Sequence, residues 1–281
     1  MLTLAMIISM MALVSCGDNG GSSTATTKGA ESTKAATESK AATETKAATE
    51  TKAATTEASG DKPVLVMATN ATFPPYEYTE GEKFVGIDIE IATALADKIG
   101  MTLEIKNVEF DSILPGIQSG SFTIGMAGMT VTAERLETVN FSTPYAKGVQ
   151  VVIVKEGSEI ASIDDLTGKK IGVQSGTTGD IYASDDYGEE NVSRYTNGPD
   201  AVQALVSGKV DAVIIDNEPA KNYVAANEGL KILETSYADE DYAIAIAKSD
   251  TDLLNKINDA LKALTDDGTI PAIIEKYIPS K

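Results

Sequence analysis

The sequence predicts an α/β fold of two lobes, each a mostly parallel β-sheet flanked by helices. Short apolar runs, typical of strands buried on both faces, alternate with segments in which apolar residues recur at helical spacing. This alternation occurs in two series along the chain, and alternating strands and helices predict parallel sheets. The chain after residue 62 has about 220 residues, which suits two lobes of roughly 100 residues each.

Residues 1–16 are an apolar segment that ends in the only cysteine of the chain. The segment is too short to span a bilayer stably and is typical of a signal peptide, although no Lys or Arg precedes it. Its end, LVSCG at residues 13–17, resembles the bacterial lipobox, in which the chain is cut before the cysteine and lipid is attached to the sulfur. We therefore expect a lipoprotein signal peptide over residues 1–16 and lipidation of Cys16. The alternative is a buried apolar segment with an incidental cysteine.

A low-complexity segment follows from residue 17 to residue 62. It repeats Lys-Ala-Ala-Thr at a period of six from Lys34 onward, and this period suits neither a helix face nor a heptad. Thr, Ala, Ser and alternating charges cannot bury enough surface to offset the entropy cost of ordering the chain. We expect residues 17–62 to be a disordered stalk that gives a tethered domain its reach.

Composition excludes several classes of function. The formal net charge is −19, and residues 17–62 contribute only −1 of it, which argues against nucleic acid or an anionic lipid surface as a partner. There is no His and only one Cys, which excludes Ser-His-Asp and Cys-His catalysis, Cys/His zinc sites and internal disulfides. Carboxylate sites for Mg²⁺ or Ca²⁺ stay possible, but no D-x-D-x-D-G calcium loop is present. We expect no catalytic residue, no metal and no cofactor.

The first series begins with a strand at residues 64–68 and a loop rich in aromatic residues and proline at 70–78. A helix stripe runs from Ile87 to Ile99, and Gly100 follows as its C-cap. A strand at 103–105, a helix at 112–119 and a strand at 122–127 complete this series.

The second series has the same alternation. Strands are expected at residues 149–154, 169–173, 211–215 and 242–247, and helices after the turn at 176–179, at 199–207, at 219–227 and over the stripe from 253 to 264. Ligands of parallel sheets bind beyond the carboxyl ends of the strands. The residues that follow each strand are therefore the candidates for a site.

Arg135 and Asp216 are the first two candidates. The chain has two arginines, Arg135 and Arg194, and an Arg fork binds a carboxylate in a bidentate way that Lys cannot. Arg135 follows the strand that ends at Ala127; the alternative is an exposed helix residue, which we expect for Arg194. Asp216 ends a buried strand, where a lone carboxylate suits an ammonium group. A helix N-cap is the alternative for Asp216, and it is the better one if this residue is taken alone.

Two further features complete the candidate site. The turn at residues 176–179 (GTTG) follows a strand and opens a helix, so its backbone N–H groups favour an anion, although many loops look alike. Phe73 and Phe110 follow strand ends, where flat rings could sandwich a ligand; the alternative is a pair of core aromatic residues. One fixed cation, one fixed anion and aromatic walls describe a site for a zwitterion, whose two charges cancel when the site closes.

These motifs, in this order, resemble the bacterial solute-binding proteins of polar amino acid ABC transporters, over essentially all of residues 63–281. The best local match is Gly86 to Ile99, where alternating aliphatic and acidic residues open a helix stripe. The segments FPPYE at 73–77, GMTVTAER at 128–135 and GVQSGTTG at 172–179 also fall in the family's order.

The resemblance implies a type II periplasmic-binding-protein fold, in which two crossing strands join lobes that close around the ligand. It implies a first lobe of residues 63–147 plus 243–281 and a second lobe of residues 148–242. The helix after Gly86 would be structural, and we expect Asp88 and Glu90 to lie outside the pocket.

The resemblance also implies roles for the site residues. Arg135 would clamp the α-carboxylate of the ligand, helped by backbone N–H groups at Thr130 and Thr178. Asp216 would take the α-ammonium group together with the Gly128 carbonyl, and two phenylalanine rings would sandwich the ligand. The expected ligand-binding residues are Asn70, Phe73, Tyr76, Glu77, Phe110, Gly128, Met129, Thr130, Arg135, Gln174, Thr177, Thr178 and Asp216.

Specificity would depend on residues that face the ligand side chain. Asn70 and Gln174 stand where many relatives have Asp and some have Lys. Two neutral amides favour a polar uncharged side chain, such as that of cystine or glutamine. Glu77, if it points inward, favours arginine or lysine instead, and the sequence leaves this choice open.

The resemblance implies a monomeric lipoprotein on the extracytoplasmic face of the bacterial cell membrane. It would capture a polar L-amino acid and deliver it to an ABC transporter permease, with no chemistry of its own. An enzyme on the same fold is one alternative, for which Glu77 is the only nearby carboxylate that we can name. A surface adhesin or sensor is another alternative, since a fold by itself does not decide function.

Overall fold

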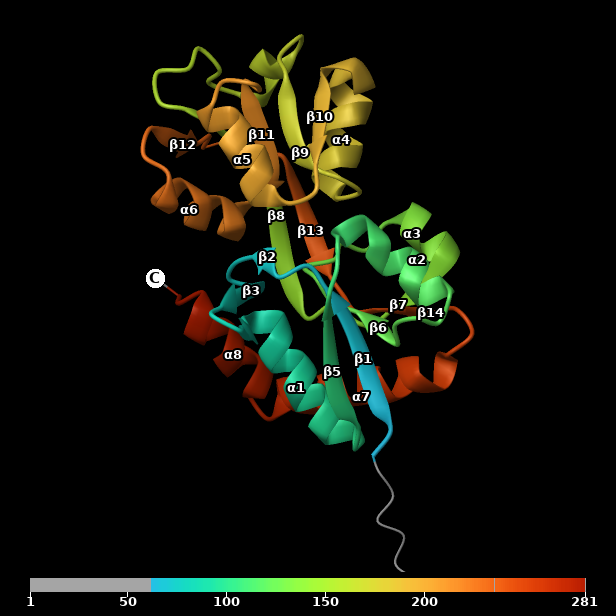
Figure 1. The fold of residues 1–281 in the computed structure, drawn as a ribbon. Helices are drawn as coiled ribbons and strands as arrows, with labels where there is room; N and C mark the ends of the chain where they lie inside the picture. The colour runs from blue at the N-terminus through green and yellow to red at the C-terminus, as the bar shows by residue number, and fades with distance from the viewer. Residues whose placement is uncertain (1–61, 235, 281) are drawn as a thin grey trace, which may run out of the picture. The chain divides into compact units, whose positions relative to one another are not determined.

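The computed structural model describes residues 62–234 and 236–280. The expected signal peptide, the lipidation of Cys16 and the stalk through residue 61 lie outside these residues. Among the described residues, no helix has both the length and the apolar character needed to cross a membrane. The described chain contains two large β-sheets with helices packed against them and a small third sheet (Figure 1).

The first lobe is built on a five-stranded mixed sheet. Its strands are β1 (Val64–Thr69), β5 (Thr102–Asn107), β6 (Ile124–Gly125), β7 (Val139–Phe141) and β14 (Ala245–Ala247), in the order β5-β1-β6-β14-β7. β1, β5 and β6 are parallel, and β14 runs antiparallel to both neighbours. Its helices are α1 (Ile87–Ile99), α2 (Ile113–Gln118), α3 (Ala133–Thr138), α7 (Thr251–Asp266) and α8 (Thr269–Tyr277), with a 3₁₀ turn η1 (Phe110–Ser112). A small antiparallel sheet of β2 (Thr72–Phe73), β3 (Glu77–Glu80) and β4 (Lys83–Val85) packs near α1.

The second lobe has a sheet in the order β10-β9-β11-β8-β12, with β13 paired to β8. Its strands are β8 (Ala146–Lys155), β9 (Ile171–Gln174), β10 (Val192–Tyr195), β11 (Ala212–Asp216), β12 (Leu230–Ile232) and β13 (Ala238–Tyr242). Its helices are α4 (Thr178–Tyr187), α5 (Gly198–Val206) and α6 (Asn217–Ala226), with 3₁₀ turns η2 (Ile163–Leu166) and η3 (Glu189–Asn191). β9, β10 and β11 are parallel, and β8 is antiparallel to β11.

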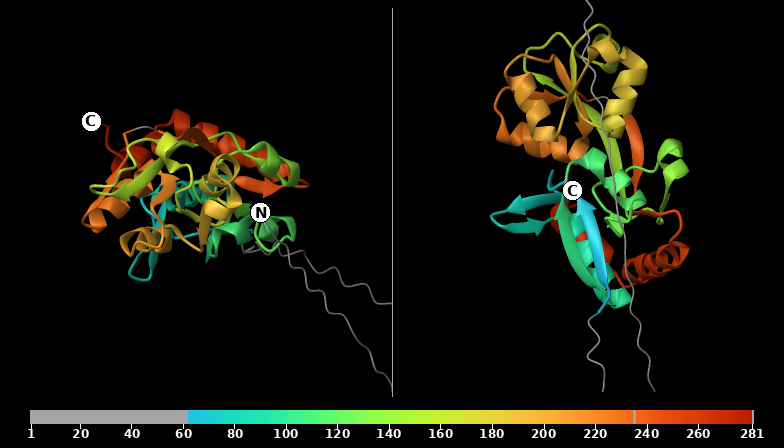
Figure 2. Two further views of the ribbon diagram at one scale, coloured as in Figure 1. Left: turned by 90° about the horizontal axis from the view of Figure 1, so that it is seen from above. Right: turned by 45° about the vertical axis from the view of Figure 1, so that its right-hand side comes forward.

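Helices cover both faces of the second sheet. Successive residues of a strand point to opposite faces, and β8 shows this division clearly. Val151 and Ile153 pack in a cluster with α5 and α6, whereas Val152 and Val154 pack in a separate cluster with Ala183 of α4. Figure 2 shows these helices from two further sides. Strands buried on both faces explain the continuous apolar runs in the sequence.

The strands β8 and β13 connect the two lobes, as Figure 1 shows. They pair in antiparallel register, from Ala146 opposite Tyr242 to Gln150 opposite Ala238, and β8 then continues beside β11 in the second sheet. The predicted lobe boundaries at residues 148 and 242 fall on these two strands. Because the strands belong to both lobes, the division at those residues stays a prediction.

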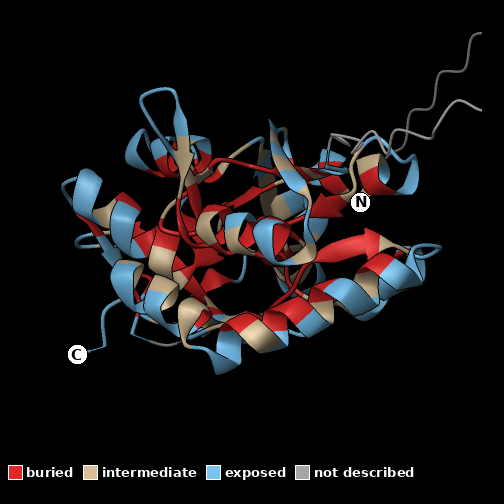
Figure 3. Ribbon diagram, turned by 90° about the horizontal axis from the view of Figure 1, so that it is seen from below, coloured by how far each residue is buried: buried red, intermediate tan, exposed pale blue. Residues whose placement is uncertain are grey.

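Helix α1 forms where the sequence has its apolar stripe. Ile87, Ile91 and Leu95 are fully buried and recur every four residues. Gly100, at φ 75°, ends the helix in the left-handed conformation, and its N–H bonds to the carbonyls of Ala96 and Asp97. Figure 3 shows the result for the helices in general: buried faces turn toward the sheets and exposed faces turn toward solvent.

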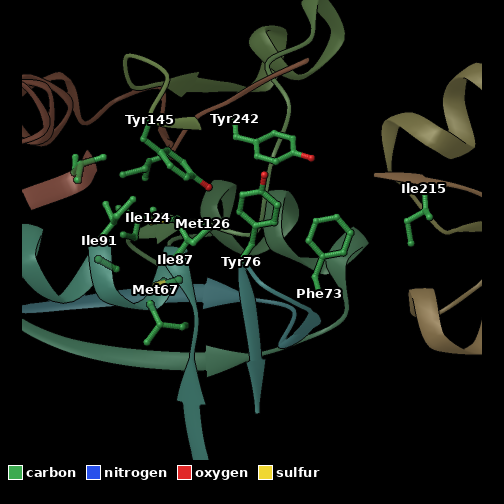
Figure 4. Packing of buried hydrophobic residues seen from close by; sticks show 14 of the residues in the cluster. Met67, Phe73, Tyr76, Ile87, Ile91, Ile124, Met126, Tyr145, Ile215 and Tyr242 are labelled. Carbon is green, nitrogen blue, oxygen red and sulfur yellow. The ribbon is translucent and has the colours of Figure 1, made fainter. Parts of the chain in front are cut away.

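An aromatic cluster ties the connecting strand β13 to the core of the first lobe (Figure 4). The ring centroids of Tyr76 and Tyr242 are 5.1 Å apart in an edge-to-face arrangement, and the Phe73 ring lies 5.9 Å from Tyr76. Met67 and Met126 are fully buried in the same cluster. Since Tyr242 is the last residue of β13, this packing fixes the strand where it enters the first lobe.

Three expected elements differ from the structure. Residues 122–127 contain only the two-residue β6, and the expected loop at 70–78 contains β2 and the start of β3. The expected strand at 242–247 is split between β13 and β14. The reason is that the N–H groups of Ala243 and Ile244 bond to the Met129 carbonyl and the Ser142 hydroxyl, so the chain leaves one sheet before it joins the other.

Several elements were not predicted, and one residue was misplaced. The elements that the pattern missed include β4, β7, β10, β12, α8 and all of β13 except its last residue, and most of them are short or carry few apolar residues. Arg194 lies on strand β10 and not on a helix. Its Nε donates to Asp180 at 2.8 Å, so Arg194 is a partner of that carboxylate and not a solitary surface charge.

Candidate ligand-binding site

A cavity lies between the two lobes, with about 310 Å³ of empty space including the part open to solvent. It is lined by Asn70, Phe73, Glu77, Phe110, Ala127, Gly128, Thr130, Arg135, Gln174, Thr177, Thr178 and Asp216. The structure therefore brings together all of the expected ligand-binding residues except Tyr76 and Met129. Tyr76 packs behind the cavity against Tyr242, and Met129 is fully buried in the core of the first lobe.

The carboxyl ends of parallel strands supply this cavity from both sides. Asn70 follows β1 and Ala127 follows β6 in the first lobe, while Gln174 ends β9 and Asp216 ends β11 in the second. Parallel strands present their carboxyl ends at one edge of a sheet, so residues distant in sequence meet there. The two sheets place these edges on opposite walls of one cavity.

Arg135 is held by carbonyl groups of both lobes. Its Nη1 donates to the Thr130 carbonyl at 2.7 Å, and its Nη2 donates to the Gly176 carbonyl at 2.9 Å. Thr132 caps helix α3 by accepting the N–H of Arg135, and the guanidinium carbon lies 5.4 Å from the centre of the Phe110 ring. The side chain is only 6% exposed, and burial lowers its pKa, yet Arg stays charged at neutral pH. The cavity thus has one fixed cation.

Asp216 lies at the N-cap position of α6, but its side chain makes no capping hydrogen bond. Its carboxyl group instead accepts a hydrogen bond from the Tyr242 hydroxyl. Burial raises the pKa of Asp216 well above its usual value, and the nearby Glu240 carboxylate adds to this effect. The helix-cap alternative is therefore wrong for this side chain, which faces the cavity.

Glu240 was missed by the sequence analysis. It lies on β13, 5% exposed, and its Oε2 accepts hydrogen bonds from Thr130 Oγ1 and Gln150 Nε2, each at 3.0 Å. Three of the five residues at 238–242 (ADEDY) are acidic, a composition that is typical of a solvated loop. A strand with Glu240 and Tyr242 on its inner face explains the pattern, and this two-residue period was the available signal.

Glu77 points inward, which answers the question that the sequence left open. It lines the cavity, is 1% exposed, and its Oε2 has no donor among the described residues. Burial raises the pKa of Glu77 well above its usual value, and the Asp88 carboxylate raises it further. A buried carboxyl group in a ligand cavity can either pair with a cation or, once protonated, donate a hydrogen bond.

Asp88 and Glu90 lie outside the cavity lining, in agreement with the sequence analysis. Asp88 is fully buried and accepts hydrogen bonds at Oδ2 from the Gly128 N–H at 2.9 Å and the Tyr145 hydroxyl at 2.8 Å. Burial raises its pKa to about 6, although these two donors act in the opposite direction. Glu90 lies on the outer face of α1 and pairs with Lys276.

The two amides expected to face the ligand side chain bond to each other. Gln174 Nε2 donates to Asn70 Oδ1 at 3.0 Å across the two lobes. Asn70 also donates to the Val108 carbonyl at 2.7 Å and accepts from the Thr72 hydroxyl at 2.8 Å. These contacts engage both ends of the Asn70 amide, so Glu77 has the more available polar group on this wall.

The turn at residues 176–179 is organised by its own side chains. Gly176 adopts φ +75°, and a Cβ there would lie 3.0 Å from the Cβ of Asp111 on the first lobe. The Gly176 N–H donates to Asp180 Oδ2 at 3.0 Å, and Thr177 caps α4. Since this N–H is engaged within the turn, it is not one of the free anion donors that the sequence suggested.

Comparison with known proteins identifies the family. The sequence model of the bacterial extracellular solute-binding proteins, family 3, matches residues 65–280. The arginine-binding extracellular protein ArtP of Bacillus subtilis (strain 168) is 34% identical over 77% of this chain and 86% of its own length. A solved structure of an ancestral arginine-binding protein bound to arginine is 42% identical, has a TM-score of 0.73, and covers 78% of this chain and 100% of its own. The same protein bound to glutamine is 41% identical, has a TM-score of 0.75, and covers 78% of this chain and 99% of its own. The chain therefore belongs to the bacterial extracellular solute-binding proteins, family 3, and its two lobes form their type II periplasmic-binding-protein fold.

Proposed function

We propose that this protein binds a free polar L-amino acid between its lobes and delivers it to the permease of an ABC transporter. One observation carries the proposal: Arg135 and Asp216, both buried, line the same cavity from opposite lobes. A fixed cation and a fixed acid suit the α-carboxylate and α-ammonium groups of an amino acid. Relatives that are named as arginine-, histidine- or cystine-binding proteins support the same substrate class.

The ligand backbone would lie between Arg135 and Asp216, with its α-carboxylate on the guanidinium group. Both charges of the ligand then meet an opposite charge, so the backbone adds no net charge to the closed site. Phe73 and Phe110 line the cavity and are nearly buried, so they can contact the ligand from both sides. Since the two charged residues come from different lobes, a ligand that contacts both favours closure.

For the ligand side chain, we favour a basic group, arginine foremost. Among the described residues, Glu77 is the acidic group of the cavity lining with an oxygen that lacks a donor, and a guanidinium group would supply one. A neutral amide such as that of glutamine is the second candidate. The raised pKa of Glu77 favours it, because a protonated carboxyl group can donate to an amide carbonyl.

We propose no catalytic step. General acid–base chemistry would need a carboxyl group aimed at a reacting atom, and Glu77 is the candidate among the lining residues. Incubation with candidate amino acids and analysis of the products by mass spectrometry tests this point. Any turnover that depends on Glu77 contradicts the binding-protein proposal.

We further propose that the mature protein is a monomer anchored by lipid on Cys16 to the extracytoplasmic face of the membrane. The lipobox-like residues 13–17 and the polar repeat after them support this proposal. Replacing Cys16→Ser should move the protein from the membrane fraction to the soluble fraction and abolish incorporation of labelled fatty acid. Retention in the membrane, or dimers in light scattering, contradicts it.

A ligand panel tests the central proposal. The chain from residue 17 onward is unfolded and refolded to remove bound ligand, then titrated calorimetrically with amino acids, cystine and small organic acids. At a hundredfold excess over Kd, a ligand raises the free energy of unfolding by about 2.7 kcal/mol, so a thermal melt confirms each hit. We expect one or a few L-amino acids to bind. If none binds, the proposed function is wrong.

A further inference from the structure

A chain of four buried polar side chains runs behind the cavity from one lobe to the other. Thr130 Oγ1 donates to Glu240 Oε2 at 3.0 Å, and Gln150 Nε2 donates to the same oxygen at 3.0 Å. Gln150 Nε2 also donates, at the longer distance of 3.4 Å, to Thr178 Oγ1. Thr130 and Thr178 line the cavity on the first and second lobes. Glu240 and Gln150 lie outside the lining, on the connecting strands β13 and β8 (Figure 1), and we call them the bridging pair.

Strand pairing holds the members of this chain in place. Thr130 forms an antiparallel bridge with Tyr242, which lies two residues beyond Glu240 on β13. Gln150 lies opposite Asp216 in the ladder between β8 and β11. The four side chains are at most 6% exposed. Backbone register and burial thus give each hydroxyl a fixed partner, and a side chain locked in this way keeps one orientation.

The contact between Gln150 and Thr178 depends on a glycine. Thr178 is the first residue of α4, and Gly179 follows it. A Cβ at position 179 would lie 3.1 Å from Gln150 Oε1 and 3.1 Å from the Ile214 carbonyl oxygen. Both distances are shorter than an ordinary contact between nonbonded atoms. The missing side chain at Gly179 therefore leaves the space in which Gln150 reaches the start of α4.

The bridging pair determines how each threonine hydroxyl can act toward the cavity. A hydroxyl has one hydrogen to donate and two lone pairs that accept. Thr130 gives its hydrogen to Glu240, so only its lone pairs remain for a ligand. Thr178 accepts from Gln150, so its own hydrogen remains for a ligand. The two lobes therefore present one accepting hydroxyl and one donating hydroxyl.

This pair of hydroxyls matches the backbone groups of an amino acid. An ammonium group has only hydrogens to donate, and a carboxylate only accepts. The accepting hydroxyl of Thr130 suits the α-ammonium group, and the donating hydroxyl of Thr178 suits the α-carboxylate. With the opposite orientation, two donors or two acceptors would face each other in a buried site, and an unpaired buried polar group is costly.

We propose that Glu240 and Gln150 are positioning residues for ligand binding. Without touching the ligand, they fix the Thr130 hydroxyl as an acceptor and the Thr178 hydroxyl as a donor. This inference rests on the proposed amino acid site and extends it into the two strands that connect the lobes.

Calorimetric titration tests the role of Glu240, with L-arginine, L-glutamine and any further amino acid that the ligand panel finds. Glu240→Leu should lower the affinity for each of them by a similar factor, about tenfold, because all amino acids share the same backbone groups. Glu240→Gln should restore most of this loss, to within about threefold of the parent, because its amide oxygen can accept from the same two donors. Oε1 of Glu240 has no donor among the described residues, so an amide nitrogen there breaks no bond.

Double-mutant cycles test whether the bridging pair acts through the threonines. Thr130→Val keeps the shape of the side chain, removes its hydroxyl and should cost about tenfold in affinity. Adding Glu240→Leu to it should cost less than about a further threefold, because the hydroxyl that Glu240 orients is already gone. The same relation should hold when Gln150→Leu is added to Thr178→Val. Urea unfolding of each variant shows that it is folded, and the second cycle stands by itself if Glu240→Leu does not fold.

The outcomes separate this inference from the proposed function. If the parent protein binds no amino acid of the panel, the proposed function itself fails. If the parent binds but the losses in both cycles multiply, the bridging pair acts through general stability, so the inference is wrong and the proposed function stands. The inference is also wrong if Glu240→Gln loses as much affinity as Glu240→Leu, because the charge of Glu240 would then matter and not its role as an acceptor.

Discussion

Gln174 on the second lobe and Asn70 on the first are joined by a hydrogen bond, Nε2 to Oδ1 at 3.0 Å. The bond spans the cleft, so it exists only when the lobes are in contact. The same hydrogen bond occupies the side-chain oxygen of Asn70, which the sequence analysis had expected to face the ligand side chain. The structure thus gives these two amides a part in closure.

Gln174→Ala should weaken the binding of every ligand by a similar factor. The variant loses one neutral hydrogen bond of the closed state, worth about 0.5–1.5 kcal/mol, or roughly twofold to tenfold in affinity. Calorimetric titration with arginine, citrulline and glutamine measures the factor for each. A loss of affinity for only one of these ligands would show that Gln174 contacts the ligand side chain.

Arg135→Ala should abolish ligand binding at micromolar concentrations. The variant removes the buried cation that faces the α-carboxylate, and truncating one partner of a buried charge pair costs about 2–5 kcal/mol. Arg194→Ala is the matched control, because Arg194, on β10, pairs with Asp180 of α4 and does not line the cavity. Its affinity should stay within about threefold of the parent. Equal losses of affinity in both variants would mean that Arg135→Ala weakens binding through a folding defect and not through a lost contact with the ligand.

Asp216→Asn should weaken amino acid binding by about the same 2–5 kcal/mol, since it removes the acid proposed to hold the α-ammonium group. Tyr242→Phe keeps that acid and removes only the hydroxyl that donates to it. The loss for Tyr242→Phe should therefore be smaller, near 1 kcal/mol. Titration with an amino acid and with its des-amino analogue checks the assignment. The two ligands should bind Asp216→Asn with nearly equal affinity.

Gly86→Ala should destabilise the protein by about 3 kcal/mol or more. Gly86 has φ +125°, and an added Cβ would lie 2.2 Å from the carbonyl oxygen of Tyr76. Gly100→Ala is the control, because its φ is also positive but no atom lies within 4 Å of an added Cβ. It should cost only about 1 kcal/mol. Urea unfolding followed by circular dichroism compares the two, and equal losses would contradict the steric explanation.

Acidification from pH 6.5 to pH 4 should stabilise the parent relative to Asp88→Asn. The folded pKa of Asp88, about 6, lies above its ordinary value of 3.8. Between these values the folded state binds more protons than the unfolded state, so the free energy of unfolding rises as pH falls. The span corresponds to about 3 kcal/mol, an upper value for the relative change. Urea unfolding of both proteins at several pH values measures it, and a difference that is constant with pH would rule it out.

Local sequence patterns predicted much of the framework. The stripe from Ile87 to Leu95 with Gly100 after it specifies α1, because helix periodicity and a left-handed cap are properties of neighbouring residues. Continuous apolar runs located β1, β8 and β11 for a similar reason. Arg135 and Asp216 were found because polar residues directly after buried strands lie at the edge of a sheet where ligands bind.

Other features of the site depend on contacts between distant segments, and local patterns could not predict them. Thr130 and Glu240 are 110 positions apart, and β13 has an acidic sequence that resembles a solvated loop until its pairing with β8 buries Glu240. The inward direction of Glu77 likewise follows from how β3 packs near α1.

The sequence by itself determined the two strand–helix series, the positions of the candidate cation and acid, and the absence of histidine chemistry, because these are properties of composition and short-range periodicity. Only the tertiary structure decided which acidic groups are buried beside the cavity, with raised pKa values, and which amides bond across the cleft. The physical reason is that burial and the distance between charges set the protonation of a carboxyl group, and both arise only when the two lobes pack around the strands that connect them.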